Sequence, residues 1–407
     1  MSSALIIGLD NGTQGTKCLV YDSERREILA QAHAPHKLIT GANGRREQEP
    51  REWLEAAGKT LRSCLAAEHV DARRVVAIGV SGQQHGCVPL DAAGHPLRPA
   101  KLWCDTETDA ECDRITERVG GHQAMVAAIG NRLAVGFTAS KVLWLQRHAP
   151  DVYARLAHIL LPHEFINLWL TGHYRAEAGD ASGTAYFDIR KRCWSQELLR
   201  AIDPRRDLSS CLPELIAPDT PHGRLRPELA QSLGLSPEVL VSAGGGDNMM
   251  AAIGTGNVSP GVVTVSLGTS GTVFAYSDQP VVDADGEVAA FCSSSGGWLP
   301  LVCTMNVTVA TENIRRLLNL SLREFDTAAG EAPRGAGGLL LLPFFNGERT
   351  PPWPRASALF AGMTTENCER RNVCRAAMEG ATLGLRYGLE AMQRQGVRPK
   401  EIRLVGG

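Results

Sequence analysis

The stretch Asp-Asn-Gly-Thr-Gln-Gly-Thr-Lys at residues 10–17 combines groups that could hold phosphate and a metal ion. Gly12 and Gly15 would let the backbone approach phosphate oxygens and present N–H groups as a concave anion site. Asp10 follows an apolar strand-like run, and its carboxylate could bind Mg²⁺ directly or through water. Two hydroxyl groups and one ammonium group add further donors: Thr13, Thr16 and Lys17. A plain hairpin turn with a capping Asp is the alternative interpretation.

A second turn of the same kind lies in the later part of the chain. Residues 262–276 again form an apolar run, a Gly-Thr turn at Gly268 and Thr269, and a returning apolar run, as residues 8–21 do. Such a degenerate internal repeat indicates two related domains. We therefore predict that both turns contact the phosphates of a nucleotide.

Residues 244–248, Gly-Gly-Gly-Asp-Asn, precede a short helix of small residues. The glycines favour a tight turn that places the Asp247 carboxylate at the N-terminus of that helix. We predict that Asp247 is the general base that removes a proton from a hydroxyl group. A helix-capping role for Asp247 is the alternative.

A polar segment, residues 81–86, follows another apolar strand-like run. Ligands of α/β sheets bind at this end of the strands. Gln84 and His85 offer donors and acceptors that suit sugar hydroxyl groups, although a lone His is often a satisfied structural residue.

The elements that would position these residues alternate along the chain. Apolar runs predict strands at 4–9, 17–21, 27–31, 75–80, 239–243, 262–267, 272–276, 338–345 and 401–405. Helical periodicity follows Pro50 and recurs at 138–148, 163–171 and 366–395. This alternation favours α/β domains with mixed sheets. Because the pattern starts again near residue 245, we place the domains at 1–245 and 246–407.

Composition excludes several classes of protein. The chain has 407 residues, which suits two or three domains, and a net charge of −2, which favours neither nucleic acid nor an acidic membrane surface. Its 11 cysteines include no CxxC pair or zinc-like cluster, and the N-terminal apolar run resembles neither a signal peptide nor a membrane span. We expect a cytoplasmic protein with reduced thiols.

The motifs together resemble the FGGY-type carbohydrate kinases, most closely the xylulokinase branch, over essentially the whole chain. The matching stretches are 8–13, 81–86, 102–105, 138–141, 179–184, 244–248, 266–272 and 342–350. The resemblance implies two ribonuclease-H-like domains of the actin/hexokinase ATPase type around a central cleft. It also implies Mg²⁺-dependent transfer of phosphate from ATP to a ketose, D-xylulose, which gives D-xylulose 5-phosphate.

The resemblance also implies roles for single residues. Asp247 would be the base and Asp10 the Mg²⁺ site. The residues implied to contact or lie near the sugar are Gln84, His85, Trp103, Asp105 and Asn248. The positions implied to contact phosphate or nucleotide are Gly12, Thr13, Thr16, Lys17, Gly268, Thr269, Gly406 and Gly407. No role follows for Glu348 and Arg349 beyond an ion pair.

The chain departs from the family pattern at two places. Gln84 stands where xylulokinases usually have Met, which leaves a kinase for a longer ketose such as sedoheptulose as an alternative. The last predicted strand ends at Gly406-Gly407, where the family continues into an adenosine-binding loop, so we expect a C-terminal segment to be lacking. A sugar-binding regulatory protein without turnover and a chaperone-like ATPase are the remaining alternatives. If the protein assembles, we expect a homodimer.

Overall fold

The computed structural model describes residues 4–406, and they divide into two compact units. The first unit runs to Ile253 and also includes Phe291–Trp298; the second consists of Gly254–Ala290 and Leu299 onward. The division therefore falls after the 245/246 boundary expected from the sequence, because the helix that follows Gly246 packs with the first unit. The predicted mixed α/β fold is confirmed in both units.

The first unit is built on a seven-stranded mixed sheet in the order β14-β15-β6-β1-β2-β3, with β16 also paired to β6. Its strands are β1 (Leu5–Asn11), β2 (Gly15–Asp22), β3 (Glu27–Pro35), β6 (Val75–Gly82), β14 (Gly223–Arg224), β15 (Leu240–Val241) and β16 (Gly245–Gly246). β1 and β2 form the predicted hairpin, and β1 lies parallel to β6.

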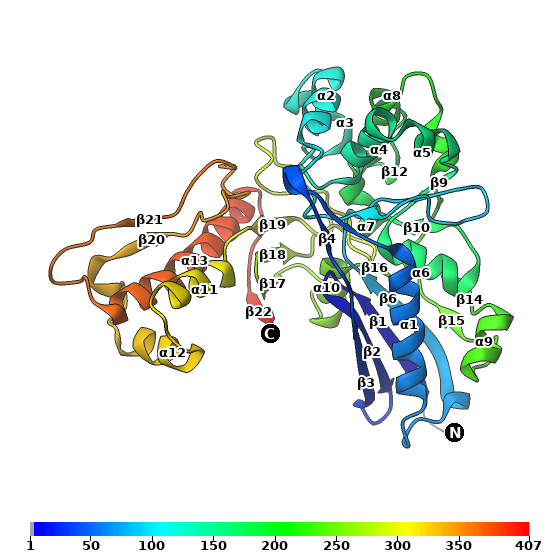
Figure 1. The fold of residues 1–407 in the computed structure, drawn as a ribbon, viewed down its shortest axis with the longest axis horizontal. Helices are drawn as coiled ribbons and strands as arrows, with labels where there is room; N and C mark the ends of the chain where they lie inside the picture. Colours follow the sequence, from blue (N-terminus) through cyan, green and yellow to red (C-terminus); the bar gives the residue numbers. More distant parts are fainter. Residues whose placement is uncertain (1–3, 407) are drawn as a thin grey trace. The chain divides into compact units, whose positions relative to one another are not determined.

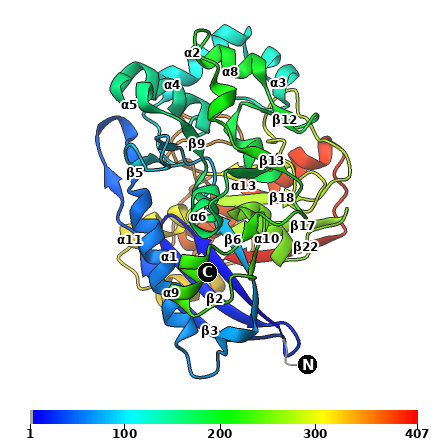
Figure 2. The same ribbon diagram turned by 90° about the vertical axis from the view of Figure 1, so that its right-hand side faces the viewer.

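Three helices, α1 (Pro50–Leu65), α6 (Pro162–Thr171) and α9 (Pro227–Leu233), pack on this sheet (Figure 1, Figure 2). Pro50 begins α1 because its fixed φ suits a first helical turn, where no N–H partner is needed. The face carrying Trp53, Ala57 and Leu61 is fully buried, as the apolar spacing after Pro50 predicts.

A second layer of this unit is a cluster of contacting helices: α2 (Asp109–Val119), α3 (His122–Ile129), α4 (Thr138–His148), α5 (Pro150–Arg155) and α8 (Gln196–Ile202). The short elements that complete the unit are β4 (Ile39–Thr40), β5 (Arg46–Gln48), β7 (Val88–Leu90), β8 (Ala100–Lys101), β9 (His158–Leu160), β10 (Arg175–Glu177), α7 (Ala178–Ala181), β11 (Phe187–Asp188), β12 (Cys193–Trp194) and β13 (Glu214–Ile216). The helix α10 (Asp247–Gly254) follows β16.

The second unit repeats the hairpin arrangement of the first. Its sheet has the order β19-β18-β17-β22, in which β17 and β18 form a hairpin and β17 lies parallel to β22. The strands are β17 (Val262–Leu267), β18 (Gly271–Ala275), β19 (Leu301–Thr304) and β22 (Glu401–Gly406). The order β3-β2-β1-β6 has the same pattern, which agrees with the internal repeat inferred from the sequence.

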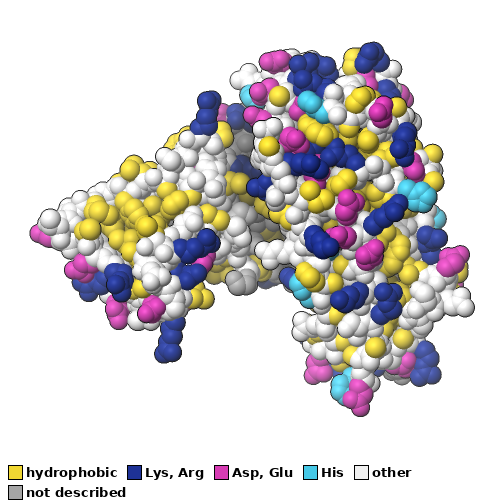
Figure 3. All heavy atoms as spheres, viewed as in Figure 1, with side chains coloured by type: hydrophobic (Ala, Val, Ile, Leu, Met, Phe, Trp, Pro, Cys, Tyr) yellow, Lys and Arg dark blue, Asp and Glu magenta, His cyan; other side chains and the backbone are white. Residues whose placement is uncertain are grey.

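The long helix α13 (Arg370–Arg394) packs against α11 (Thr308–Leu317), α12 (Leu322–Glu331), β18, β19 and the pair β20 (Leu340–Leu342) and β21 (Leu359–Ala361). Figure 3 shows hydrophobic side chains gathered over β20 and β21, where Leu340 and Leu359 are exposed. Within residues 4–406, none of the helices has the length and apolar character needed to cross a bilayer.

Candidate active site

The carboxyl ends of three neighbouring strands meet at Ser81 in the first unit. Asp10 of β1 and Gly245 of β16 both lie opposite Ser81 of β6 in parallel register. The hydroxyl of Ser81 donates a hydrogen bond of 3.0 Å to Oδ1 of Asp10. This topology places Asp10 and the start of α10 at one edge of the sheet, where α/β folds bind ligands.

Two of the three glycines before Asp247, Gly244 and Gly246, leave no room for a side chain. Gly244 has a φ of 72°, and a Cβ there would lie 2.5 Å from the carbonyl oxygen of Val80. At Gly246 a Cβ would lie 2.7 Å from Cγ of Gln84. A larger residue at either position would push the turn away from β6 and from the side chain of Gln84.

Asp247 is the first residue of α10, and its side chain is accessible to a ligand. Oδ1 of Asp247 accepts hydrogen bonds from the backbone N–H and the side-chain Nδ2 of Asn248, at 2.8 and 3.0 Å. Desolvation by the surrounding protein atoms, followed by repulsion from the Asp10 carboxylate, raises the pKa of Asp247 to about 7. A carboxylate with such a pKa suits proton transfer near neutral pH.

The amide of Gln84 connects to this carboxylate through Asn248. Nδ2 of Asn248 also donates to Oε1 of Gln84 at 2.9 Å, so Asn248 bridges Gln84 and Asp247. Nε2 of Gln84 contacts the sulfur of Met249 at 3.3 Å and Oδ1 of Asp180 at 3.5 Å. The buried amide at position 84 thus has partners within the protein, and this geometry favours a role in positioning Asn248.

His85 follows Gln84 and is almost fully buried, with 8% of its surface exposed. Its ring centroid lies 4.5 Å from that of Phe137 and 5.9 Å from that of Phe291. Phe291 belongs to the segment Phe291–Trp298, which returns to the first unit.

The turn between β1 and β2 is bonded to residues of the 81–86 and 102–105 motifs. Nε1 of Trp103 donates to the hydroxyl oxygen of Thr13 at 2.9 Å, and this hydroxyl donates to Oε1 of Gln83 at 3.0 Å. Nε2 of Gln48 donates to the carbonyl oxygen of Thr13 at 2.7 Å, and Oε1 of Gln48 accepts from Nε2 of Gln83 at 2.9 Å. Because the Thr13 hydroxyl is used inside the protein, its backbone N–H is the group left for a phosphate.

Thr16 and Lys17 have different environments on β2. Thr16 is fully buried, and its hydroxyl bonds to Oδ1 of Asn11 at 3.1 Å and to Nε2 of His36 at 2.9 Å. Lys17 is exposed and lies opposite Asp10 in the antiparallel register. Of these two predicted phosphate contacts, Lys17 alone presents its polar group to solvent.

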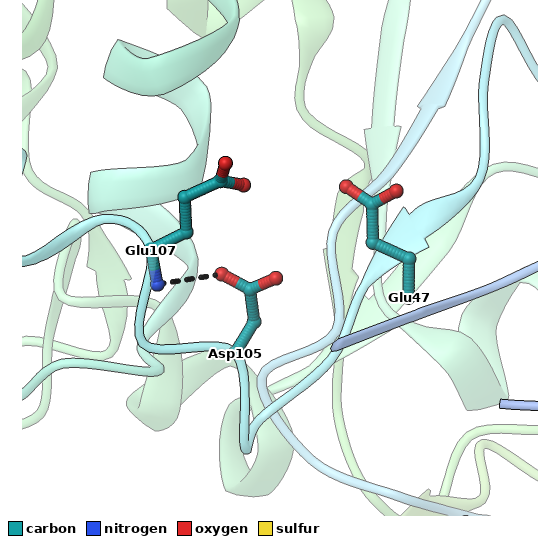
Figure 4. A group of neighbouring side chains, drawn as sticks. All are labelled: Glu47, Asp105 and Glu107. Carbon is teal, nitrogen blue, oxygen red and sulfur yellow. Dashed lines mark hydrogen bonds between the residues drawn. The ribbon is translucent and has the colours of Figure 1, made fainter. Parts of the chain in front are cut away.

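Asp105 lies in an ion cluster with Glu47, which is also buried, and Glu107, which is partly buried (Figure 4). Its oxygens accept from the backbone N–H groups of Arg46 and Glu107, at 2.8 and 3.1 Å. Nζ of Lys101 lies 3.2 Å from both Glu47 and Asp105 and also pairs with Glu107. Asp105 is fully buried, and its geometry favours support of the loop that carries Trp103.

The three carboxylates of this cluster do not fit a metal ion, because cations of the protein already neutralise them. Besides Lys101, Arg45 and Arg98 pair with Glu47. Asp10 fits a divalent cation better: among the described residues its Oδ2 has no hydrogen-bond partner, and a carboxylate oxygen is a preferred Mg²⁺ ligand.

The second predicted phosphate turn belongs to the second unit. Gly268 and Thr269 are exposed between β17 and β18, and their carbonyl oxygens accept the first N–H groups at the start of α11. Gly406 ends β22 opposite Leu267, with a φ of 138°. Gly407 lies outside the described residues.

Sequence reasoning missed Gln48, Gln83 and Lys141 as residues of this region. Gln83 and Lys141 lie in stretches that match the family, at 81–86 and 138–141, which was the available signal. Gln48 had none, because its proximity to Thr13 depends on the tertiary fold.

Comparison with known proteins identifies the family of this chain. Residues 5–254 match the N-terminal domain of the FGGY family of carbohydrate kinases, and residues 263–407 match its C-terminal domain. The xylulose kinase of Haemophilus influenzae is 46% identical over 407 residues, which cover 99% of this chain and 83% of that protein.

Two solved structures show the same fold. A structure described as a xyloylose kinase from Brucella ovis has a TM-score of 0.92 at 33% identity and covers 99% of this chain and 82% of its own. The xylulose kinase from Bifidobacterium adolescentis has a TM-score of 0.84 at 30% identity and covers 100% and 85%. This chain belongs to the FGGY family of carbohydrate kinases.

Proposed function

We propose that the enzyme transfers the γ-phosphate of ATP to the terminal hydroxyl of D-xylulose, which gives ADP and D-xylulose 5-phosphate. The xylulose kinases of Haemophilus influenzae, Brucella ovis and Bifidobacterium adolescentis support this substrate. The observation that carries the proposal is the position of Asp247. It is the first residue of α10, its Oδ1 is held by Asn248, and it lies at the same edge of the sheet as Asp10.

In this mechanism Asp247 is the general base. Its carboxylate accepts the proton as the sugar oxygen forms a bond to the γ-phosphorus and the bond between that phosphorus and the ADP oxygen breaks. The hydrogen bonds from Asn248 fix the orientation of Oδ1, so Oδ2 is the oxygen available to the hydroxyl. A pKa near 7 leaves a substantial fraction of Asp247 ionised at neutral pH.

Asp10 would hold Mg²⁺ through Oδ2, while Ser81 fixes its Oδ1. When bound, Mg²⁺ neutralises charge on the phosphate oxygens. The groups proposed to contact phosphate are Lys17 and the backbone N–H groups of Thr13 and Thr269, with Gly406 and Gly407 on the nucleotide side. Gly12 and Gly268 would shape the two turns, because their N–H groups donate to the carbonyl oxygens of Gly15 and Ser270 at 3.1 and 3.0 Å. Thr16 would contribute to the shape of the turn, because its hydroxyl is buried.

His85 and Trp103 are the proposed sugar contacts, together with Asn248. Gln84 would act mainly by holding Asn248, and Asp105 by holding the loop of Trp103. The cytoplasmic location and the homodimer stay predictions.

The test is a coupled assay of ADP release with MgATP and a panel of D-xylulose, D-ribulose, sedoheptulose and glycerol. The proposal expects the highest kcat/KM with D-xylulose and a product phosphorylated at the terminal carbon, identified by phosphorus NMR. A higher kcat/KM for sedoheptulose than for D-xylulose would show that sedoheptulose is the better substrate. Sugar binding that raises thermal stability without any ADP release would indicate a binding protein instead.

A further inference from the structure

Lys141 of α4 is a fully buried cation for which the described residues supply carbonyl oxygens and no ion pair. Lysine is almost never fully buried unless it is paired, because removing an ammonium group from water is costly. Nζ of Lys141 instead donates to two backbone carbonyl oxygens, that of His85 at 2.5 Å and that of Gly136 at 2.6 Å. Such an arrangement needs an explanation, since Met or Leu would fill the same space at lower cost.

The first of these carbonyls belongs to a strained residue. His85 has a φ of 62°, in the left-handed region that residues with a Cβ rarely adopt. Its carbonyl oxygen also accepts from the hydroxyl of Thr138 at 3.2 Å, so two donors of α4 hold this peptide group. These two hydrogen bonds from side chains of α4 therefore help to hold the His85 peptide in its strained conformation.

The conformation of the backbone sets the position of the His85 ring. The imidazole lies between Phe137 and Phe291 and over Gly183, where a Cβ would come within 2.1 Å of Nδ1. Such close packing gives the ring one orientation, provided that the peptide of His85 stays in its strained conformation.

The second carbonyl group is that of Gly136, which packs against Trp103, the other proposed sugar contact. Gly136 has a φ of 100°, and a Cβ there would lie 2.2 Å from the carbonyl oxygen of Trp103. Its backbone thus packs directly on the backbone of Trp103. One ammonium group consequently holds the segments that carry His85 and Trp103.

Lys141 stays mainly a cation at neutral pH although it is buried. Burial lowers the pKa of Lys141 to about 8, and the carboxylate of Asp105 opposes this shift while Lys101 adds to it. The ammonium is thus the main form near pH 7, and hydrogen bonds from a charged donor are stronger than those from a neutral one.

We propose that Lys141 is a positioning residue for the ketose, which presets His85 and Trp103 through the carbonyl groups of His85 and Gly136. The inference rests on the proposed function, because it takes these two side chains as sugar contacts. Lys141 does not reach the substrate itself, since it is fully buried and directed at the backbone. Its loss should therefore weaken sugar binding selectively, with little effect on ATP.

The experiment compares Lys141→Met with Arg147→Met, which removes a cation from the same helix, where Arg147 pairs with Glu111. We expect Lys141→Met to raise the KM and the calorimetric Kd for D-xylulose about tenfold or more, the equivalent of one charge-assisted hydrogen bond. The KM for ATP should change less than about twofold, and Arg147→Met should change neither KM.

If Lys141→Met does not unfold cooperatively and is therefore not properly folded, Thr138→Val tests the same inference. It removes the other hydrogen-bond donor to the His85 carbonyl oxygen. It should shift the D-xylulose KM in the same direction by a smaller factor. A folded Lys141→Met or Thr138→Val enzyme with unchanged sugar affinity would overturn the inference, as would an equal rise in both KM values. If the unsubstituted enzyme neither binds nor phosphorylates D-xylulose, the proposed function fails, and this inference fails with it.

Discussion

The indole Nε1 of Trp103 donates a hydrogen bond of 2.9 Å to the hydroxyl oxygen of Thr13. This bond links a proposed sugar contact to the turn proposed to bind phosphate. The same hydroxyl donates to Gln83, the neighbour of Gln84. The side chain of Thr13 thus connects the proposed phosphate turn to Trp103 and Gln83, which lie in the proposed sugar region.

Thr13→Val should raise the KM for D-xylulose about fivefold or more, because an unsatisfied buried partner costs about 1–3 kcal/mol. Steady-state kinetics would measure this, with Thr13→Ser as the matched control, since it keeps the hydroxyl. A loss in Thr13→Ser without a loss in Thr13→Val would mean that the methyl group, rather than the hydrogen bonds, is what matters.

Asp247→Asn should lower kcat by about 10² or more while D-xylulose still binds, because general base catalysis contributes roughly 10²–10⁴ in rate. The measurements are ADP release and calorimetric sugar binding without ATP. Near-normal turnover in this variant would show that another group accepts the proton.

The raised pKa of Asp247 also predicts a pH-dependent difference in stability. The unfolded carboxyl group ionises near its ordinary pKa, whereas the folded one ionises near 7, so its ionisation destabilises the folded state as pH rises between these values. The Tm of Asp247→Asn relative to the unsubstituted enzyme should therefore increase from pH 5 to pH 8, without Mg²⁺ or nucleotide. Calorimetry at several pH values checks this, and a pH-independent difference would contradict it.

Gln84→Met should change the preference for D-xylulose over sedoheptulose by less than about threefold, because the amide bonds to Asn248 within the protein. The measurement is the ratio of the two kcat/KM values. A large shift toward D-xylulose would instead support direct contact between Gln84 and the longer sugar.

Lys101→Met should lower the free energy of unfolding by about 3–5 kcal/mol, because it leaves the carboxylates of Glu47 and Asp105 buried with fewer cations. Denaturant unfolding measures this loss. Lys191→Met, which removes an exposed partner of Asp188, is the control and should cost less than about 1 kcal/mol. Similar losses in both variants would argue against a network centred on Lys101.

The sequence predicted most elements whose periodicity is local. The helix at 138–148 is α4 with the same bounds, and the long helix predicted at 366–395 is α13, Arg370–Arg394. The strand predicted at 239–243 is shorter, Leu240–Val241, because the chain then turns at Gly244 with a positive φ. An apolar run alone does not reveal where strand pairing stops.

Roles that depend on long-range partners were not predictable from the sequence. Thr13 was expected to offer its hydroxyl to phosphate, but Gln83 and Trp103 use that hydroxyl, and they lie far along the chain. Lys141 was noticed only as part of a motif, since no spacing rule indicates that an ammonium group will meet two carbonyl oxygens.

The segment Phe291–Trp298 completes the first unit although the chain has already entered the second one. Phe291 supplies one of the two rings beside His85, and Ser294 donates a hydrogen bond to Glu177. Domains generally fold as units from the N-terminus while the ribosome is still extending the chain. During synthesis the first unit therefore lacks one of the two rings beside His85, a proposed sugar contact, until Phe291 has been translated. The environment of His85 is completed only after the chain of the second unit has begun.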